Sequence, residues 1–133
     1  MRQVKVFILE DDAIRIKGFE QAGIGLNLTI ATSLSEAKAV WTPPYDILLL
    51  DHDLGDRQMV DGSDVNTGSE FCRWVPVGDV PRHVLIHSYN RAGALNMQSM
   101  LVCKHEIDAT ILPFGPQLLG WMRSLPWEVQ DGN

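Results

Sequence analysis

Cysteine is scarce in this chain: Cys72 and Cys103 are the only two, and each lies within an apolar segment. Two such residues make no disulfide framework, so we expect two buried free thiols. Long apolar runs are missing too, since none approaches the roughly 18 residues that a membrane-spanning helix needs. No signal peptide is evident, because Met1 to Lys5 lead directly into a short apolar strand. These absences predict a cytoplasmic protein with no membrane partner.

An excess of positive charge is absent as well. The chain carries 11 basic and 17 acidic residues, a net charge of −6, which argues against a nucleic-acid backbone as its main partner. Hydrophobic residues make up 45% and charged residues 21% of its 133 positions, as in ordinary folded proteins. This length fits one domain, and the chain shows no internal repeat and no low-complexity tract.

Five short apolar runs alternate with helical patterns. Four runs are continuous, as strands are in a parallel sheet that is covered on both faces. The run at residues 26–30 alternates with polar residues instead, which is typical of an edge strand. The continuous runs are Val4 to Leu9, Ile47 to Leu50, Val84 to Ile86 and Ala109 to Leu112, and helical patterns occur near residues 13–22, 34–40, 67–74, 94–101 and 118–125.

This alternation predicts the fold class. Strands joined by helical crossovers form a parallel sheet. Five such units match a single α/β doubly wound fold of the receiver or flavodoxin-like (βα)5 type, with strand order 2-1-3-4-5. We expect one domain at residues 1–126 and an irregular C-terminal tail at residues 127–133.

Carboxylates gather at two strand ends. Glu10-Asp11-Asp12 follow the first strand and Asp51-His52-Asp53 follow the third, and these strands are neighbours in the predicted order. Such carboxylates repel one another unless a cation lies between them. Oxygen ligands of this kind suit Mg²⁺, with Mn²⁺ or Ca²⁺ as alternatives. Solvated loop acids and helix caps are the plainer interpretation, which suits one strand end better than two adjacent ones.

Three further features bear on this edge of the sheet. About fifteen residues, from His52 to Asn66, separate the third strand from its helix, where βα loops typically have about 2–6 residues. The fourth strand ends in His87-Ser88-Tyr89-Asn90, of which Asn90 is either a helix N-cap or a ligand contact. Arg15, one turn into the first helix, is placed to reach a ligand phosphate, but we expect it on a solvated helix face instead.

The residues at the strand ends resemble those of a response-regulator receiver domain, and the resemblance covers nearly the whole chain. The residues that carry the resemblance are Ile8-Leu9-Glu10-Asp11-Asp12, Leu50-Asp51, Ser88 and Leu112-Pro113-Phe114. The resemblance implies that Glu10, Asp11 and Asp51 hold Mg²⁺, that Asp51 accepts a phosphoryl group and that Ser88 follows its charge. Receivers carry a lysine directly before the fifth-strand proline, but Leu112 stands there in this chain. Without that cation, an acyl phosphate loses a contact worth about 1.5–3 kcal/mol.

A second set of residues resembles a receiver offshoot, the cyclic-phosphate-processing receiver family. The set comprises Leu50-Asp51-His52-Asp53-Leu54-Gly55, Thr67-Gly68 and Ile86-His87-Ser88-Tyr89-Asn90, with Gly93 and Met97. Opening a cyclic phosphate with water requires a base and an acid, and imidazole serves either role near neutral pH. We therefore predict His52 and His87 as the acid/base pair, with Asp51 or Asp53 as alternatives for activating water, and Ser88 and Asn90 as phosphate contacts.

The sequence thus predicts a metal-dependent phosphoesterase that acts on a small cyclic phosphate of a nucleotide or ribose derivative. Two alternatives remain open. The chain is otherwise a stand-alone receiver that a kinase phosphorylates on Asp51 and that a signalling partner binds, or a non-catalytic docking module. The missing lysine before Pro113 weighs against the first alternative.

Overall fold

The computed structural model describes residues 2–55 and 66–129. Its main sheet is parallel and has five strands in the order β3-β2-β4-β5-β6. Counted along the chain within this sheet, the order is 2-1-3-4-5, so the predicted fold class is confirmed. The strands are β2 (Lys5–Leu9), β3 (Asn27–Ala31), β4 (Ile47–Leu50), β5 (His83–Ile86) and β6 (Thr110–Ile111).

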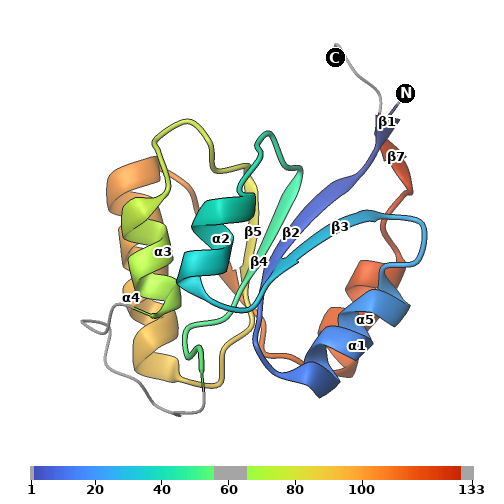
Figure 1. Cartoon of the computed structure of the whole chain (residues 1–133), viewed down its shortest axis with the longest axis horizontal. Coiled ribbons are helices and arrows are strands. Elements are labelled where there is room, and N and C mark those ends of the chain that lie inside the picture. The colour runs from blue at the N-terminus through green and yellow to red at the C-terminus, as the bar shows by residue number, and fades with distance from the viewer. Residues whose placement is uncertain (1, 56–65, 130–133) are drawn as a thin grey trace.

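Helices cover both faces of this sheet (Figure 1). One layer holds α1 (Ala13–Ala22) and α5 (Pro116–Arg123), and the other holds α2 (Leu34–Val40), α3 (Gly68–Trp74) and α4 (Arg91–His105). Among the described residues, no helix is long and apolar enough to cross a bilayer. Both cysteines are free thiols: Cys72 in α3 is buried as predicted, but Cys103 in α4 is exposed, so that part of the prediction is wrong.

Two apolar cores separate these layers, one on each face of the sheet. Leu9, Leu50 and Ile86 point into the core beneath α2, α3 and α4. Their neighbours in sequence, such as Ile8 and Leu49, point into the core beneath α1 and α5. Because successive side chains of a strand alternate between faces, a strand buried on both faces must be apolar throughout, as the Ile47–Leu50 run is.

Side chains cap the N-termini of α1 and α4 at the carboxyl edge of the sheet. Asp12 caps α1 by accepting the backbone N–H groups of Ile14 and Arg15. Asn90 caps α4, with its Oδ1 3.0 Å from the backbone nitrogen of Gly93. These caps satisfy N–H groups that a helix cannot pair internally, and they fix where α1 and α4 begin relative to the strand ends.

The C-terminal segment differs from the irregular tail that the sequence predicts. Glu128–Val129 form β7, which pairs antiparallel with β1 (Arg2–Gln3). The backbone N–H of Val4 also donates to the carbonyl of Trp127 at 2.9 Å. Two residues are too few for a strand to be recognised from sequence periodicity. The extended conformation of β7 depends on its pairing with β1. The domain boundary at residue 126 stays a prediction.

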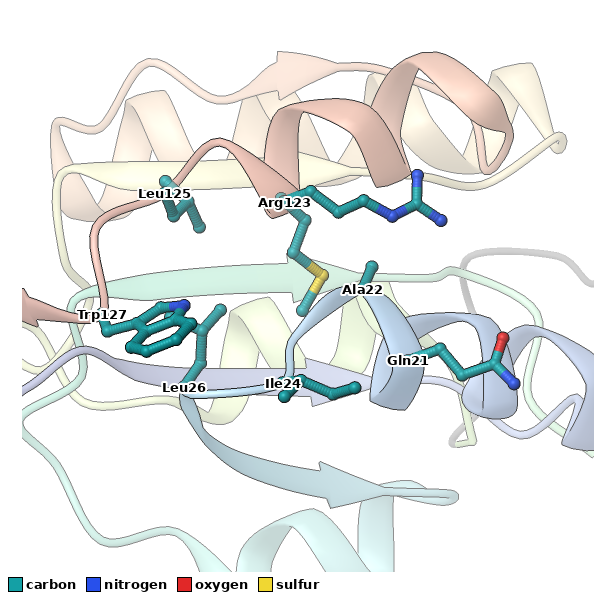
Figure 2. Close-up of a pocket in the computed structure, with 8 residues that line it drawn as sticks. Gln21, Ala22, Ile24, Leu26, Arg123, Leu125 and Trp127 are labelled. Atoms are coloured by element: carbon teal, nitrogen blue, oxygen red, sulfur yellow. The ribbon is translucent and has the colours of Figure 1, made fainter.

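A cavity of about 210 Å³ lies between the C-terminal ends of α1 and α5 (Figure 2). None of its lining residues is a carboxylate or a histidine. It lies at the opposite end of α1 from Asp12, and hence away from the carboxyl ends of the strands. The residues that line it are Gln21, Ala22, Ile24, Leu26, Met122, Arg123, Leu125 and Trp127.

Candidate functional site

Three polar side chains stand in one row just beyond the strands. The backbone nitrogen of Asp51 donates to Leu9 at 3.0 Å, and that of His87 donates to Leu50 at the same distance. The strand register therefore continues for one residue and places Glu10, Asp51 and His87 side by side. Because the residues before them face α2–α4, these three face the α1 side of the sheet.

These side chains form a buried group. His87 Nε2 lies 3.0 Å from Glu10 Oε1, and one potential ligand atom from each of Glu10, Asp51 and His87 lies within 4.8 Å of the others. Glu10 and His87 have no exposed surface and Asp51 is 4% exposed. The ring of Phe19, from α1, meets His87 edge-on with centroids 5.1 Å apart. Phe19 therefore packs against the His87 ring from the α1 side of the sheet.

The pKa values of the two carboxylates in this group are shifted in opposite directions. Burial raises the pKa of Glu10, but the hydrogen bond and charge of His87, with help from Asp12 and Arg15, hold it below its usual value. Burial raises the pKa of Asp51 to about 6, and the charge of Glu10 adds to this effect. A divalent cation between the two carboxylates would offset the cost of burying their negative charges and their mutual repulsion. The ligand atoms of this group therefore fit such an ion.

Arg15 lies over this group, and the expectation that it occupies a solvated helix face is wrong. Its Nη1 atom is 3.7 Å from Glu10 Oε1 and 3.9 Å from Asp51 Oδ2. Its guanidinium carbon is 5.1 Å from the ring centre of Tyr89 and 5.7 Å from that of Phe114. A signal in the sequence was available, because Arg15 precedes the buried Phe19 by four residues and so points to the same side of α1.

Leu112 occupies the next place in the same row. Its backbone nitrogen donates to the carbonyl of Ile86 at 2.8 Å, and its side chain packs against the core beneath α1 and α5. The row thus ends in an apolar side chain where the receiver pattern has a lysine. Arg15 brings a positive charge to these carboxylates from α1 instead.

Asp11, predicted as a metal ligand, is not among the residues whose ligand atoms lie within 4.8 Å of one another. Its Oδ2 atom accepts the backbone N–H of Gly55 at 2.8 Å and so ties the start of the β4–α3 connection to β2. Burial raises the pKa of Asp11, an effect that the Gly55 hydrogen bond opposes and the charge of Glu10 reinforces. Asp11 therefore lies close enough for the charge of Glu10 to raise its pKa, although it is not part of the group of Glu10, Asp51 and His87.

His52 lies on the other side of the sheet from His87. Its Nδ1 atom is 2.8 Å from Asp53 Oδ1, and Asn90 Nδ2 donates to the same oxygen at 2.9 Å. An ionised carboxylate only accepts, so Nδ1 carries the proton in this contact. The structure thus places the two predicted acid/base histidines in different groups, His52 with Asp53 and Asn90, His87 with Glu10.

Two glycines let the backbone approach the Asp51-His52 segment closely. A Cβ atom on Gly93, in α4, would lie 2.4 Å from Cγ of His52, and one on Gly68, in α3, would lie 2.1 Å from the carbonyl oxygen of Asp51. Contacts below 3.0 Å require a neighbour to move. Both glycines belong to the pattern that carries the cyclic-phosphate-processing resemblance, and close packing explains their presence.

Ser88 and Asn90 are engaged locally. Ser88 Oγ accepts the backbone N–H of Asn90 at 3.0 Å, and both residues are more than nine-tenths buried. The ends of the long connection are also tied: Asp53 forms an antiparallel bridge with Thr67, and Asn66 accepts the backbone N–H of Leu34. Residues 56–65, within the loop singled out from the sequence, lie outside the described residues.

Fold and strand-end chemistry together define a protein of the receiver class. Residues 6–102 match the family described as the cyclic-phosphate processing receiver domain, and the chain belongs to this family. The resemblance found in the sequence is confirmed. No curated protein matches the chain significantly.

Several solved structures that share this fold are response regulators or their receiver domains. The non-phosphorylated receiver domain of HemR from Leptospira biflexa is 18% identical with a TM-score of 0.63, over 96% of this chain and 100% of that one. The phosphorylated cyanobacterial phytochrome response regulator RcpA is 18% identical with a TM-score of 0.61, over 91% and 89%. The Mn²⁺-bound response regulator Rcp1 is 12% identical with a TM-score of 0.62, over 95% and 99%. At these identities the likeness concerns the fold alone.

Proposed function

We propose that this chain binds a divalent cation at Glu10 and Asp51 and hydrolyses a phosphate ester there, with a cyclic phosphate of a nucleotide or ribose derivative as substrate. One observation carries the proposal. Two carboxylates and an imidazole lie within 4.8 Å of one another, buried, at the carboxyl edge of a parallel sheet, where ligands of such folds bind. Membership of the cyclic-phosphate processing receiver family supports the choice of substrate class.

Glu10 and Asp51 are the residues that would hold the cation. Mg²⁺ and Mn²⁺ take one or two protein carboxylates and complete their shells with water and phosphate oxygens. Rcp1, which shares this fold, was solved in a Mn²⁺-bound form. When bound, the cation would neutralise phosphate oxygens and favour attack by water. Asp11, which the charge of Glu10 already affects, would add negative charge at the edge of the site.

His87 is suited to carry the proton. Hydrolysis forms one bond from water oxygen to phosphorus and breaks one phosphorus–oxygen ester bond, while one proton leaves the water and one reaches the departing oxygen. Because His87 Nε2 donates to Glu10, the other nitrogen of a neutral ring, Nδ1, carries a lone pair. Nδ1 is buried and has no hydrogen-bond partner in the described structure. It can therefore take the proton from water and return it to the leaving oxygen.

His52, Asp53 and Asn90 position this site in our proposal. The backbone N–H of His52 donates to Asp51 Oδ1 at 2.9 Å and so orients the carboxylate. The His52 ring binds Asp53, which also accepts from Asn90 at the start of α4. Ser88 accepts through its oxygen, so its hydroxyl proton is the donor that a phosphoryl oxygen would meet.

A hydrolysis screen with a matched histidine control tests the proposal. Nucleoside 2′,3′-cyclic phosphates, 3′,5′-cyclic nucleotides and ADP-ribose cyclic phosphate are incubated with Mg²⁺ or Mn²⁺, and phosphomonoester release is measured. We expect turnover that EDTA abolishes and that His87→Ala lowers by at least about 10². His83→Ala, an exposed residue at the other end of the same strand β5, should retain full activity. Full activity in His87→Ala would overturn the role of His87, and silence of the wild type across the panel would overturn the enzymatic proposal.

Phosphorylation of Asp51 is the second candidate. Asp51 ends the third strand of the sheet in a chain whose fold resembles that of phosphorylated RcpA, and Ser88 follows His87 on the neighbouring strand. Covalent labelling of Asp51 by a small phosphodonor, or ordering by beryllofluoride, would support this candidate and a signalling partner. A protein that binds neither a divalent cation nor beryllofluoride would instead be a docking module.

A further inference from the structure

We propose that Arg15 is the phosphate-binding cation of this site and that it competes with the divalent ion for Glu10 and Asp51 when no phosphate is present. This inference rests on the proposed function, in that it assumes a site for both a cation and a phosphoryl group. It adds a residue that no motif in the sequence marks and assigns it a dual role.

The position of Arg15 is the first support. Glu10 and His87 have no exposed surface and Asp51 has almost none, whereas the Arg15 side chain is 28% exposed and its Nη1 atom faces both carboxylates. Among the described residues, Arg15 thus lies between the acidic group and solvent. A ligand that reaches the carboxylates from this side must meet or displace the guanidinium.

The state of its hydrogen bonds is the second support. Distances of 3.7 and 3.9 Å are ion-pair distances, longer than a hydrogen bond. A guanidinium has five N–H donors in a planar fork that matches phosphate, and those of Arg15 that face the carboxylates are not committed to short bonds. The head group is therefore attracted to the acids without being locked to them.

An aromatic pair holds the guanidinium in this position. Tyr89 follows β5 and Phe114 follows β6, and their rings lie 5.1 and 5.7 Å from the Arg15 head group. Tyr89 also donates from its hydroxyl to the carbonyl of Phe114, which links the two. Arginine stacks on such rings while its edge stays free to donate. The pair aims the charge at the site, whereas a solvated arginine would be free to turn away.

Charge then predicts two effects of opposite sign. In the empty site, Arg15 screens Glu10 and Asp51, so its positive charge repels an incoming divalent ion. With the ion bound, an arriving phosphate is attracted by the guanidinium and receives charge-assisted hydrogen bonds. Removal of the charge should therefore tighten cation binding and weaken phosphate binding. A merely structural arginine would affect both in the same direction.

Arg15→Met is the test variant, because methionine keeps an unbranched apolar stem for the aromatic pair and removes only the charged head. Lys17→Met, on the exposed face of the same helix, makes the same change in net charge as a control. Mn²⁺ binding is measured by electron paramagnetic resonance, and inorganic phosphate binding to the Mn²⁺-loaded protein by calorimetry. Circular dichroism melts confirm that each variant is folded, and Arg15→Lys is a second variant that keeps the charge.

We expect Arg15→Met to bind Mn²⁺ about three- to tenfold more tightly and phosphate at least about tenfold more weakly. Arg15→Lys should recover part of the phosphate affinity, and Lys17→Met should match the wild type. Loss of both affinities, or unchanged phosphate binding, would overturn the role of Arg15 while leaving the metal site intact. A wild-type protein that binds no Mn²⁺ would overturn the proposed function and this inference together.

Discussion

His87 Nε2 lies 3.0 Å from Glu10 Oε1, and neither side chain has exposed surface. The other oxygen of Glu10 accepts the backbone N–H groups of Asp11 and Asp12, each at 3.1 Å. A carboxylate held by three donors is fixed in direction, and it fixes the orientation of the imidazole in turn. This contact joins a strand end to one 77 residues later in the chain and sets the geometry of the acidic group.

Glu10→Gln is expected to weaken Mn²⁺ binding by at least about tenfold while the protein stays folded. The amide keeps an oxygen for the backbone N–H groups but removes one of the two charges that attract the ion. Asp12→Asn is the matched control, since asparagine caps a helix as well as aspartate does and Asp12 lies outside the acidic group. Electron paramagnetic resonance titration of both variants decides. Equal Mn²⁺ affinities for Glu10→Gln and wild type would show that the ion, if bound, lies elsewhere.

Cation affinity should fall steeply below pH 6. The pKa of Asp51 is raised to about 6 by burial and by the charge of Glu10, and a carboxyl group must lose its proton to bind a metal. At pH 7 the group is mostly ionised and at pH 5 mostly protonated, so one competing proton lowers the apparent affinity about tenfold over this range. Calorimetric titration with Mn²⁺ at pH 5, 6 and 7 measures it. An affinity that is flat between pH 5 and 7 would argue against Asp51 as a ligand.

The same shift predicts that Asp51→Asn stabilises the metal-free protein at neutral pH. An aspartate whose folded-state pKa lies above its unfolded value favours folding most when protonated, and this contribution is lost as pH rises from about 4 through 6. Asparagine mimics the protonated form and keeps an oxygen for the His52 N–H. We expect a gain on the order of 1–3 kcal/mol in the free energy of unfolding at pH 7.5, which disappears near pH 4.

Denaturant titrations in EDTA at the two pH values measure this difference. The lowered pKa of Glu10 makes a contribution of the opposite sign, which favours folding at pH 7.5 and is lost as the pH falls, and both proteins carry it. If the variant is less stable than the wild type at pH 7.5, then the hydrogen bonds and positive charges around ionised Asp51 outweigh the cost of its burial.

The strand order and the meeting of acidic residues at the carboxyl edge of the sheet were predictable from the sequence, because each depends on a local sequence pattern. The buried run Ile47–Leu50 admits no polar side chain, so the first polar residue after it, Asp51, marks the strand end. Parallel topology then brings such ends together. The positions of Glu10 and His87 follow by the same reasoning, although their direct contact depends on the register of three strands.

The sequence analysis did not predict that His52 and His87 lie on opposite faces of the sheet. The alternation of side chains along an extended segment would have indicated it. His52 follows Asp51 by one residue, so extended backbone sends the two side chains to opposite faces. His87 follows Ile86, which faces α2–α4, and so it joins Asp51. The pairing of β7 with β1 had no comparable signal, because two-residue strands have no periodicity to detect.

Gly93→Ala is expected to destabilise the protein by about 1–3 kcal/mol, because a Cβ there would lie 2.4 Å from the buried ring of His52. Gly120→Ala is the matched control: that helical position has no atom within 4 Å of an added Cβ, so alanine should stabilise by up to about 1 kcal/mol. In a His52→Ala background the cost of Gly93→Ala should largely disappear, since the clashing ring is gone. Denaturant unfolding of the four proteins in this double-mutant cycle measures the coupling. A cost that persists without His52 would trace the requirement for glycine to the α4 backbone rather than to the histidine ring.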